Sequence, residues 1–301
     1  MLILIAGITG MVGQPCAEAA LARGHSVRGM GRSPEKLGNN LLHRLEGFEK
    51  IDGIYDIPAL DRAVAGVDAI IYASTFTPEV LMEGQLLLLR AAERAGVKIF
   101  HAASWNYDWT RGYLGQHESY DPYICFAAHV RLSSTIKPLY MFTGAIAEFI
   151  FSGRRDDIWD RKTKTFKHFG DATKSLRYTT ANDLAAYTVE AVTAPDAVEG
   201  GFVRVQSFEV SPADIVKAYE SARGGQLKAN AQCVGSLADA EAMLAKARAT
   251  TDLLDFESYI GLSYVVHPLR GSWDYEPVDC SRFRNVQQTS LEEWFQAHSE
   301  L

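Results

Sequence analysis

Three glycines near the start of the chain have the spacing of a phosphate-binding turn. They lie in Gly7-Ile8-Thr9-Gly10-Met11-Val12-Gly13, directly after the apolar run Leu2–Ala6. Glycine at the first place permits a tight turn, glycine at the second lets the backbone approach a pyrophosphate, and glycine at the third lets a helix pack close to the strand. Amide groups at the start of that helix then face the phosphates. The segment predicts a dinucleotide site formed by Gly7, Thr9, Gly10, Met11, Val12 and Gly13, the alternative being an ordinary glycine-rich turn.

The end of the second apolar segment indicates which nucleotide would bind. NAD sites usually have an acidic residue there, because a carboxylate holds the ribose 2′-hydroxyl. Here Ser26–Gly31 ends in glycine, and Arg32 follows. A guanidinium can hold a 2′-phosphate through two parallel hydrogen bonds, and Lys36 could add a second charge. The sequence therefore favours NADP(H), unless Arg32 is only a solvated loop arginine.

A dense group of aromatic and polar residues follows the fifth apolar run. Two tryptophans lie within His101-Ala102-Ala103-Ser104-Trp105-Asn106-Tyr107-Asp108-Trp109, a composition that suits the wall of a pocket. We expect Trp105, Asn106 and Trp109 to contact a substrate. Further along, His117 beside Glu118 could form an acid–base pair and Tyr120 could donate a proton, although a solvated loop would also explain this stretch.

These residues are positioned by alternating strand and helix patterns. In the first half we expect strands over 2–6, 26–31, 45–51, 67–73, 97–101 and 139–143, with helices over 14–23, 58–65, 78–95 and 121–136 between them. That order predicts an α/β fold with a Rossmann-like, doubly wound parallel sheet. Later segments predict strands over 165–169, 175–179 and 202–206 and helices over 182–194 and 236–250. A further helix is expected to open at Ser211-Pro212, and a closing helix to span 289–295. We expect a cofactor domain over 1–150 and a smaller C-terminal substrate lobe over 151–301, with about 171–210 returning to the first domain.

Composition excludes several classes of protein. The chain has 301 residues, 47% of them hydrophobic, and a net charge of −7 without a long basic run, which argues against nucleic acid and acidic membranes as partners. The four cysteines are far apart, and the sequence has no metal-binding motif, so we expect reduced thiols and no metal site. With no signal peptide and no apolar stretch long enough to span a bilayer, the expected location is the cytoplasm.

Taken in order, these motifs resemble the NmrA-like and isoflavone-reductase-like branch of the atypical short-chain dehydrogenases. The resemblance rests on the glycine motif, Arg32, Ser104-Trp105-Asn106, Asn182-Asp183-Leu184-Ala185 and Thr289-Ser290-Leu291-Glu292-Glu293-Trp294. It implies a Rossmann-like fold over nearly the whole chain and an NADP(H) cofactor. It also implies that Ser74, Thr75 and Phe76 lie along the cofactor with Ser104, and that Phe149, Phe166 and Tyr178 line a substrate pocket.

The resemblance places the proton-transfer group on the helix over 121–136, where related reductases have a lysine and this chain has His129. Histidine can transfer a proton near neutral pH, although His129 could instead only pack or hold the cofactor ribose. The Tyr-x-x-x-Lys pair of the main short-chain dehydrogenases is absent from the sequence, since no tyrosine stands four residues before a lysine. Tyr107, four residues before Arg111, is a second candidate that could act through water.

The expected function is reduction of a small, largely apolar or aromatic metabolite by NADPH, in secondary metabolism. Two alternatives use the same fold: an isomerase or cyclase without net redox change, and a non-catalytic NADP(H) sensor. The partner would be a small molecule, with a second copy of the chain in a homodimer or another protein if the role is regulatory.

Overall fold

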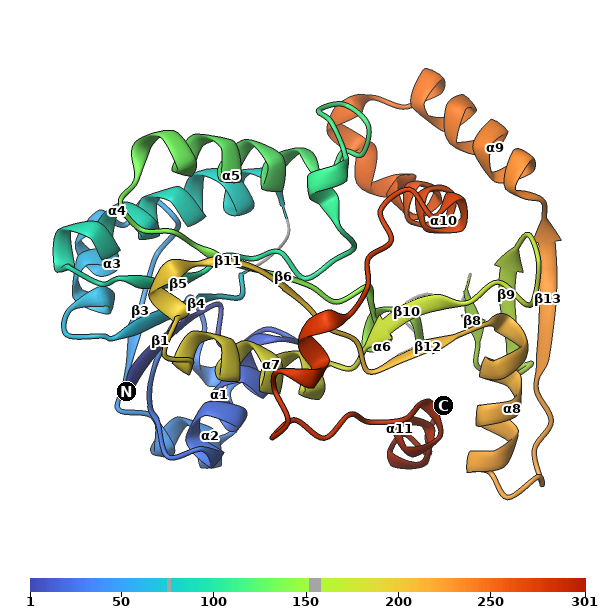
Figure 1. Ribbon diagram of the computed structural model, residues 1–301, viewed down its shortest axis with the longest axis horizontal. Coiled ribbons are helices and arrows are strands. Elements are labelled where there is room, and N and C mark those ends of the chain that lie inside the picture. Colours follow the sequence, from blue (N-terminus) through green and yellow to red (C-terminus); the bar gives the residue numbers. More distant parts are fainter. Residues whose placement is uncertain (75–76, 152–157) are drawn as a thin grey trace.

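A parallel sheet forms the larger of two bodies in the computed structural model, which describes residues 1–74, 77–151 and 158–301 (Figure 1). The seven strands lie in the order β11-β6-β5-β4-β1-β2-β3, all parallel. Chain order reverses between β1 and β4, and the ends of these neighbouring strands are where such sheets bind dinucleotides. The strands are β1 (Leu2–Ala6), β2 (Ser26–Gly31), β3 (Gly47–Lys50), β4 (Ala69–Tyr72), β5 (Ile99–His101), β6 (Leu139–Phe142) and β11 (Gly201–Arg204).

Helices cover both faces of this sheet because successive side chains of each strand point to opposite sides. One face packs against α3 (Ile57–Val64), α4 (Gln85–Ala95) and α5 (Asp121–Ser133). The opposite face packs against α1 (Gly13–Ala22), α2 (Asn39–Arg44) and α7 (Ala181–Thr193). The first turns of α4 are preceded by a π-helix, η2 (Val80–Gly84), so the segment expected as one regular helix changes its hydrogen bonding along its length.

A smaller lobe is built around two three-stranded sheets, β12-β10-β7 and β13-β9-β8. Their strands are β7 (Ala145–Ile146), β8 (Trp159–Asp160), β9 (Thr165–Phe169), β10 (Leu176–Thr179), β12 (Phe208–Val210) and β13 (Asn230–Gly235). The lobe helices are α6 (Ala147–Phe151), α8 (Pro212–Ala222), α9 (Leu237–Thr250), α10 (Ile260–Arg270) and α11 (Leu291–Ala297). Short 3-10 turns occupy Pro34–Lys36, Trp109–Arg111, Ala197–Glu199, Leu253–Ser258 and Val278–Ser281. Within the described ranges, no helix combines the length and apolarity needed to cross a bilayer.

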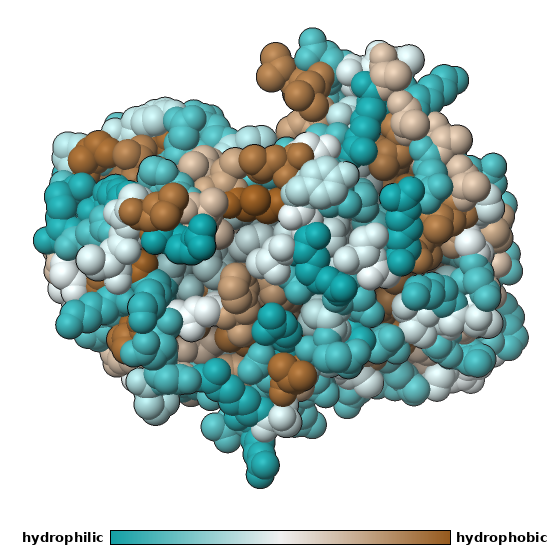
Figure 2. Space-filling model, turned by 45° about the horizontal axis from the view of Figure 1, so that its top comes forward, coloured by the Kyte–Doolittle hydropathy of each residue, from teal (hydrophilic) through white to brown (hydrophobic). Residues whose placement is uncertain are grey.

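The chain passes between the two bodies more than once. After β6 it enters the lobe, and it returns to the large sheet as α7, which packs beside α1, and β11, which pairs with β6. An ion pair also joins the bodies, since Arg248 of α9 contacts Glu118 at 2.8 Å and donates to the Gln116 carbonyl. Figure 2 shows a notch in the outline of the molecule between the larger body and the lobe.

Local signals explain most helix starts. Ser211, Ser236 and Ser290 each cap a helix through a reciprocal hydrogen-bond pair with the acidic residue three positions later. The helix expected from Asp121 begins at that residue, but the cap position is Tyr120, because the Asp121 carboxylate accepts from the Gly115 amide instead.

Candidate functional site

The glycine turn after β1 is packed so closely that two of its glycines have no room for a side chain. Gly7 has a φ of +78°, and a Cβ there would lie 2.5 Å from the Ala73 carbonyl oxygen at the end of β4. A Cβ at Gly13 would overlap the backbone of Gly7 and Ile8. At Gly10 a Cβ would lie 3.2 Å from the Gly7 carbonyl oxygen, a contact that a small shift can relieve. The fold therefore requires glycine at 7 and 13 more strictly than at 10.

The middle of the turn is presented at the edge of the sheet where the strands end, which we call the carboxyl edge. The Gly10 amide donates to the Gly7 carbonyl at 2.9 Å, and the Gln14 side-chain amide donates to the Thr9 carbonyl at 3.2 Å, so the turn is held in one conformation. Thr9 and Met11 are partly exposed and Val12 is buried. The turn leads directly into α1, and the start of a helix is where a phosphate group would bind.

The end of β2 carries an unpaired arginine. Arg32 is exposed, and neither an ion pair nor a hydrogen bond engages its side chain among the described residues. The preceding Gly31 is not demanded by packing, since a Cβ there would meet the Phe48 ring at an ordinary 3.6 Å, whereas at Gly29 it would meet the same ring at 2.9 Å. Lys36 lies exposed in the 3-10 turn that follows. A free cation after a glycine is the arrangement that a 2′-phosphate would use.

The two serines expected along the cofactor, Ser74 and Ser104, differ in burial and in hydrogen bonding. Ser74 follows β4 and is partly buried at the carboxyl edge, whereas Thr75 and Phe76 lie outside the described residues. Ser104 is fully buried. Its hydroxyl donates to the Ala102 carbonyl at 2.9 Å and accepts from the Met141 amide at 2.8 Å. That hydroxyl is therefore engaged in joining β5 to β6 and does not face the carboxyl edge.

Asn106 is the centre of a hydrogen-bond network beyond β5. It forms a bridge with Phe142 at the end of β6, which places it at the carboxyl edge. Its Oδ1 accepts from the Tyr107 amide at 3.1 Å and from the Tyr120 hydroxyl at 2.6 Å, while its Nδ2 donates to the Tyr264 hydroxyl at 3.0 Å. The network joins the larger body to α10 of the lobe.

Two of the predicted residues that flank Asn106 in the chain differ in their access to the carboxyl edge. Trp105 is partly buried, and its Nε1 donates to the Thr188 hydroxyl of α7 at 3.0 Å, which fixes the indole ring. Tyr107 is buried, and its hydroxyl donates to the Arg177 carbonyl of β10 at 3.3 Å. Burial raises the pKa of Tyr107 well above its ordinary value. The Tyr107 hydroxyl therefore points into the junction with the lobe.

Behind Asn106, a group of stacked rings that we call the imidazole cluster fills the junction between the bodies. It consists of His117, Tyr120, Tyr264, His267 and Trp273. His117 stacks on Tyr120 with ring centroids 4.2 Å apart, and His267 stacks on Trp273 at 3.9 Å. Both imidazoles are buried, and none of their nitrogens has a hydrogen-bond partner among the described residues. Burial lowers the pKa of His267 to about 4 and that of His117 well below its ordinary value, so both rings are neutral.

A third buried imidazole lies at the end of β5. His101 is fully buried and stacks on Trp105 with ring centroids 5.0 Å apart. Burial lowers its pKa to about 3. Its ring nitrogens also have no partner within the described ranges, so this residue packs as a neutral aromatic ring.

His129 lies away from the carboxyl edge. It is exposed on α5, its Nε2 is 3.5 Å from an Arg90 guanidinium nitrogen, and its carbonyl accepts from the Ser133 hydroxyl. The side of α5 that faces the sheet carries Phe126 and Val130. Because neighbouring positions on a helix point about 100° apart, His129 turns outward, and the structure does not bring it together with Asn106 or the glycine turn.

Most of the remaining predicted pocket aromatics are core residues here. Trp109 is buried against the sheet and packs edge-on to Tyr140, Phe142 and Phe202. Phe166 and Tyr178 are buried in the lobe core around Phe151. Phe149 of α6 is partly buried beside the core under α1 and α7. Large apolar rings are favoured in such cores because burial removes their area from water, so only Phe149 of the set keeps an exposed edge.

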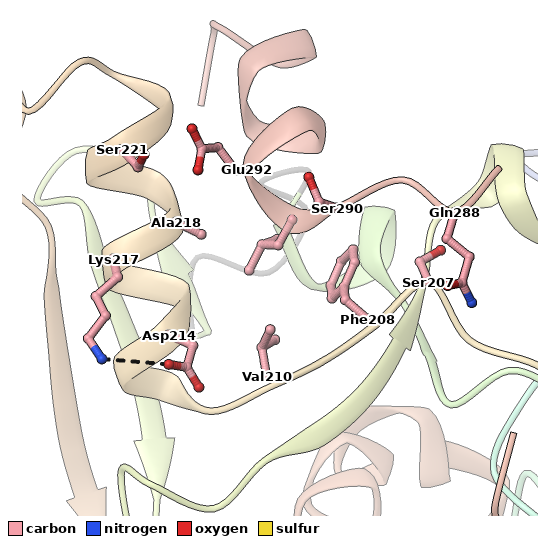
Figure 3. Close-up of a pocket in the computed structure, with 11 residues that line it drawn as sticks. Ser207, Phe208, Val210, Asp214, Lys217, Ala218, Ser221, Gln288, Ser290 and Glu292 are labelled. Carbon is pink, nitrogen blue, oxygen red and sulfur yellow. Dashed lines mark ion pairs between the residues drawn. The ribbon is translucent and has the colours of Figure 1, made fainter.

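One open hollow lies in the lobe between α8 and α11. It has a volume of about 570 Å³ and an apolar floor that includes Phe208 and Leu291. Figure 3 shows Lys217 paired with Asp214 on α8 at one side and Glu292 on α11 at the other. None of the predicted site residues lines this hollow.

Tyr264 was not among the residues predicted from the sequence. This residue is partly buried, lies on a helix that was not expected, and directs its hydroxyl to the carboxyl edge through Asn106. Burial raises the pKa of Tyr264, and hydrogen bonds from Asn106 and Ser119 oppose that rise. Nothing in the local sequence marks it, because its position depends on packing between the bodies. Over the parts of the chain that the structure describes, no three His, Cys, Asp or Glu side chains are grouped as a metal site would require.

One family model and one curated relative match the sequence of this chain. The model of the NmrA-like family matches residues 1–240. An uncharacterized oxidoreductase of Schizosaccharomyces pombe is 41% identical over 80 residues, which cover 25% of this chain and 24% of that protein. The match thus spans about a quarter of the length of that relative.

Solved structures resemble the whole chain. An isoflavone reductase superposes with a TM-score of 0.78 at 19% identity, covering 99% of each chain. A leucoanthocyanidin reductase–NADPH complex from Vitis vinifera gives 0.76 at 16% identity, also over 99% of each chain. An NADPH-dependent quinone oxidoreductase from Escherichia coli gives 0.70 at 17% identity over 99% of each chain. At these identities the similarity establishes the Rossmann-like fold.

Proposed function

The chain belongs to the NmrA-like family, and from this premise we propose that it is an oxidoreductase that reduces a small, largely apolar or aromatic metabolite with NADPH. Structural neighbours with the same fold include an isoflavone reductase and reductases crystallised with NADPH or NADP⁺. Their cofactor and reaction class support the proposal for this chain.

The proposal depends most on the residues at the end of β2, where an arginine without a partner follows a glycine. NADP(H) differs from NAD(H) only by the 2′-phosphate, so a protein that selects it needs a cation and no carboxylate at that point. Arg32 supplies an exposed guanidinium without a partner in the described chain, and it follows Gly31, where a Cβ would make only an ordinary contact with Phe48. A structural arginine would normally be paired, as Arg28 is with Glu46 at 2.8 Å.

The residues present fit the cofactor along the carboxyl edge. The turn from Gly7 to Gly13 would hold the pyrophosphate, Arg32 and Lys36 the 2′-phosphate, and Ser74 the ribose or carboxamide. When bound, NADPH supplies a hydride. Trp105 and Phe149, both partly buried, would provide apolar contact for a flat substrate beside the nicotinamide.

A second function is favoured by one specific observation. The two predicted proton-transfer residues do not meet at the carboxyl edge, since His129 faces solvent and the Tyr107 hydroxyl is bonded to Arg177. An NADP(H)-binding regulator would need the cofactor site without those groups. Such a regulator would bind NADPH with the same preference but would not consume it in the presence of any carbonyl substrate.

Titration of the purified protein with NADPH and NADH tests the cofactor site. We expect NADPH to bind more tightly, and Arg32→Ala to remove about 1.5–3 kcal/mol of NADPH binding, the range for a hydrogen bond to a charged group. NADH binding should be unchanged. Arg131→Ala, which removes an exposed arginine far along α5, is the matched control. Equal affinity of the unmodified protein for both nucleotides would contradict the proposal.

A further inference from the structure

The strand β13 forms an open margin of the lobe. It pairs with β9 alone, so it is the outermost strand in the order β13-β9-β8, and Figure 1 shows it at the right-hand edge of the molecule. Four of its six residues are exposed, and Val234 keeps 46% of its area accessible. Among the described strands, none pairs with its outer side. The backbone groups on that side are therefore available to a partner.

This margin lacks the features that normally prevent one sheet from pairing with another. Short length, charged side chains and proline are the usual protection of an edge strand. The described strands at the other sheet margins have such protection: β7 and β8 are only two residues long, and β3, β11 and β12 carry Glu49 and Lys50, Arg204, and Glu209. The sequence of β13, Asn-Ala-Gln-Cys-Val-Gly, has six residues and neither a charge nor proline. An edge of this kind is a template for a further strand.

The direction of the free backbone groups follows from the pairing with β9. The Asn230 amide donates to the Lys164 carbonyl at 2.9 Å, so it points toward β9. Consecutive residues of a strand direct their N–H and C=O groups to opposite sides, and the register with β9 is regular as far as Cys233. Ala231 and Cys233 therefore direct their amide and carbonyl groups away from β9, whereas Gln232 directs its own toward it.

We propose that a second copy of this chain pairs with β13, antiparallel, about a two-fold axis at Gln232. Ala231 of each copy then faces Cys233 of the other copy, and each of these two pairs exchanges two hydrogen bonds across the interface. The three-stranded sheets of the two copies become one continuous sheet. This dimer goes beyond the proposed reductase function and does not depend on it.

The margin is complementary to itself in charge and in hydrogen bonding. Antiparallel pairing brings the end of β13 that follows Lys228 against the end of the other copy from which α9 begins. Lys228 contacts Glu220 at 3.1 Å but its side chain stays 76% exposed. The Asp239 carboxylate at the start of α9 is exposed and accepts from the Ser236 amide at 2.8 Å. The two-fold axis thus places a lysine near a carboxylate at both ends of the interface, and at its centre Gln232 meets its own copy, where an amide can both donate and accept.

Charged substitutions at Gln232 test the two-fold axis, because each substituted residue would meet itself. Gln232→Lys and Gln232→Glu should each raise the dissociation constant of the dimer by about 10-fold or more, since like charges directly opposite on paired strands repel and the amide pair is lost. An equimolar mixture of the two variants should dimerise again as a mixed dimer. Analytical ultracentrifugation measures all three samples, and Gln287→Lys, at an exposed position before α11, is the control that should keep the unmodified value.

A disulfide tests the register of the pairing. In a Cys233→Ser background, Gln232→Cys would place two thiols opposite each other with their Cα atoms about 4.5 Å apart, within the range that a disulfide spans. Asn230→Cys is the matched control, because its two copies would be separated by about 14 Å along the strands. Mild oxidation should convert the Gln232→Cys protein to a covalent dimer on a non-reducing gel and leave the Asn230→Cys protein monomeric.

Three results would overturn the inference. One is an unmodified chain that stays monomeric at about 100 µM, where a specific dimer should be populated. Another is a dimer that survives both charged substitutions at Gln232. The third is dissociation by one charge but not by the other, which would indicate a partner of different chemistry on this margin. None of these measurements involves NADPH or turnover, so a failure of the reductase proposal would leave them unchanged.

Discussion

Because three imidazoles are buried, we expect the free energy of unfolding of this protein to fall at mildly acidic pH. Burial lowers the pKa of His101 to about 3, that of His267 to about 4 and that of His117 well below its ordinary value, while an unfolded chain keeps a histidine pKa near 6.5. A depressed folded-state pKa means that the unfolded chain binds protons first. The contribution is therefore complete above pH 6.5 and is lost as the pH falls toward 4.

The magnitude follows from the linkage relation. An imidazole with a pKa near 6.5 in the unfolded chain and of 4 or below in the folded protein lowers the free energy of unfolding at pH 5.5 by about 1.4 kcal/mol relative to pH 8. His101 and His267 together contribute about 3 kcal/mol, which is a large part of the 5–15 kcal/mol typical of a domain, and His117 acts in the same direction. Glu148 acts in the opposite sense, since burial raises its pKa, and a comparison between variants cancels its contribution.

Urea unfolding of the unmodified protein and of His267→Phe, measured at pH 5.5 and 7.5, isolates one imidazole. Phenylalanine can keep the stacking on Trp273 but cannot bind a proton, so the free energy of unfolding of the variant should change by about 1.4 kcal/mol less between the two pH values. His43→Gln, an exposed position on α2, should leave the pH dependence unchanged. Identical pH dependence in His267→Phe and the unmodified protein would refute the account of a buried neutral ring.

Two further predictions concern the glycine turn and α5. Gly10→Ala should fold with nearly normal stability and lose NADPH affinity by at least 10-fold, whereas Gly13→Ala should lower the free energy of unfolding by about 2 kcal/mol or more, because only a Cβ at Gly13 overlaps the backbone. Thermal unfolding with and without NADPH distinguishes the two variants. Normal NADPH binding by Gly10→Ala would mean that the turn has only a structural role. His129→Ala should keep kcat and NADPH affinity within about 2-fold, since the ring faces solvent near Arg90; a fall of the size expected for a lost acid would restore His129 as the proton donor.

The large sheet was predictable because its strands carry strong local signals. Leu2–Ala6 was expected with its observed limits, since a strand buried on both faces is a continuous apolar run bounded by glycine or a turn. Ser26–Gly31 was also expected with its observed limits, although Ser26 and Arg28 interrupt its apolar residues. The family expected from the motif order is confirmed by the family match. The lobe was less predictable, because its short strands pair with segments distant in the chain.

The helix α10 shows most clearly why part of the site was missed. Ile260–Arg270 contains adjacent valines and Pro268, and its cap residue Tyr259 makes no side-chain capping bond. Such a segment has the local preference of a strand or loop and becomes helical through packing. The positions of Tyr264 and of the imidazole cluster therefore could not be predicted from the local sequence. The outward direction of His129, in contrast, could have been derived from the buried spacing of Phe126 and Val130 on the same helix.

The return of the chain to the large sheet affects the order in which the protein can be completed during synthesis. The sheet lacks its last strand, and the face of β1 and β4 lacks α7, until residue 204 has left the ribosome. At about 5–20 residues per second, the roughly 60 residues between β6 and β11 take about 3–12 s to appear. During that interval the apolar surface that α7 will cover stays open to chaperones and to other nascent chains. A fragment ending near residue 150 would hold the same surface open permanently, so the nucleotide-binding body depends on later residues to become a soluble unit.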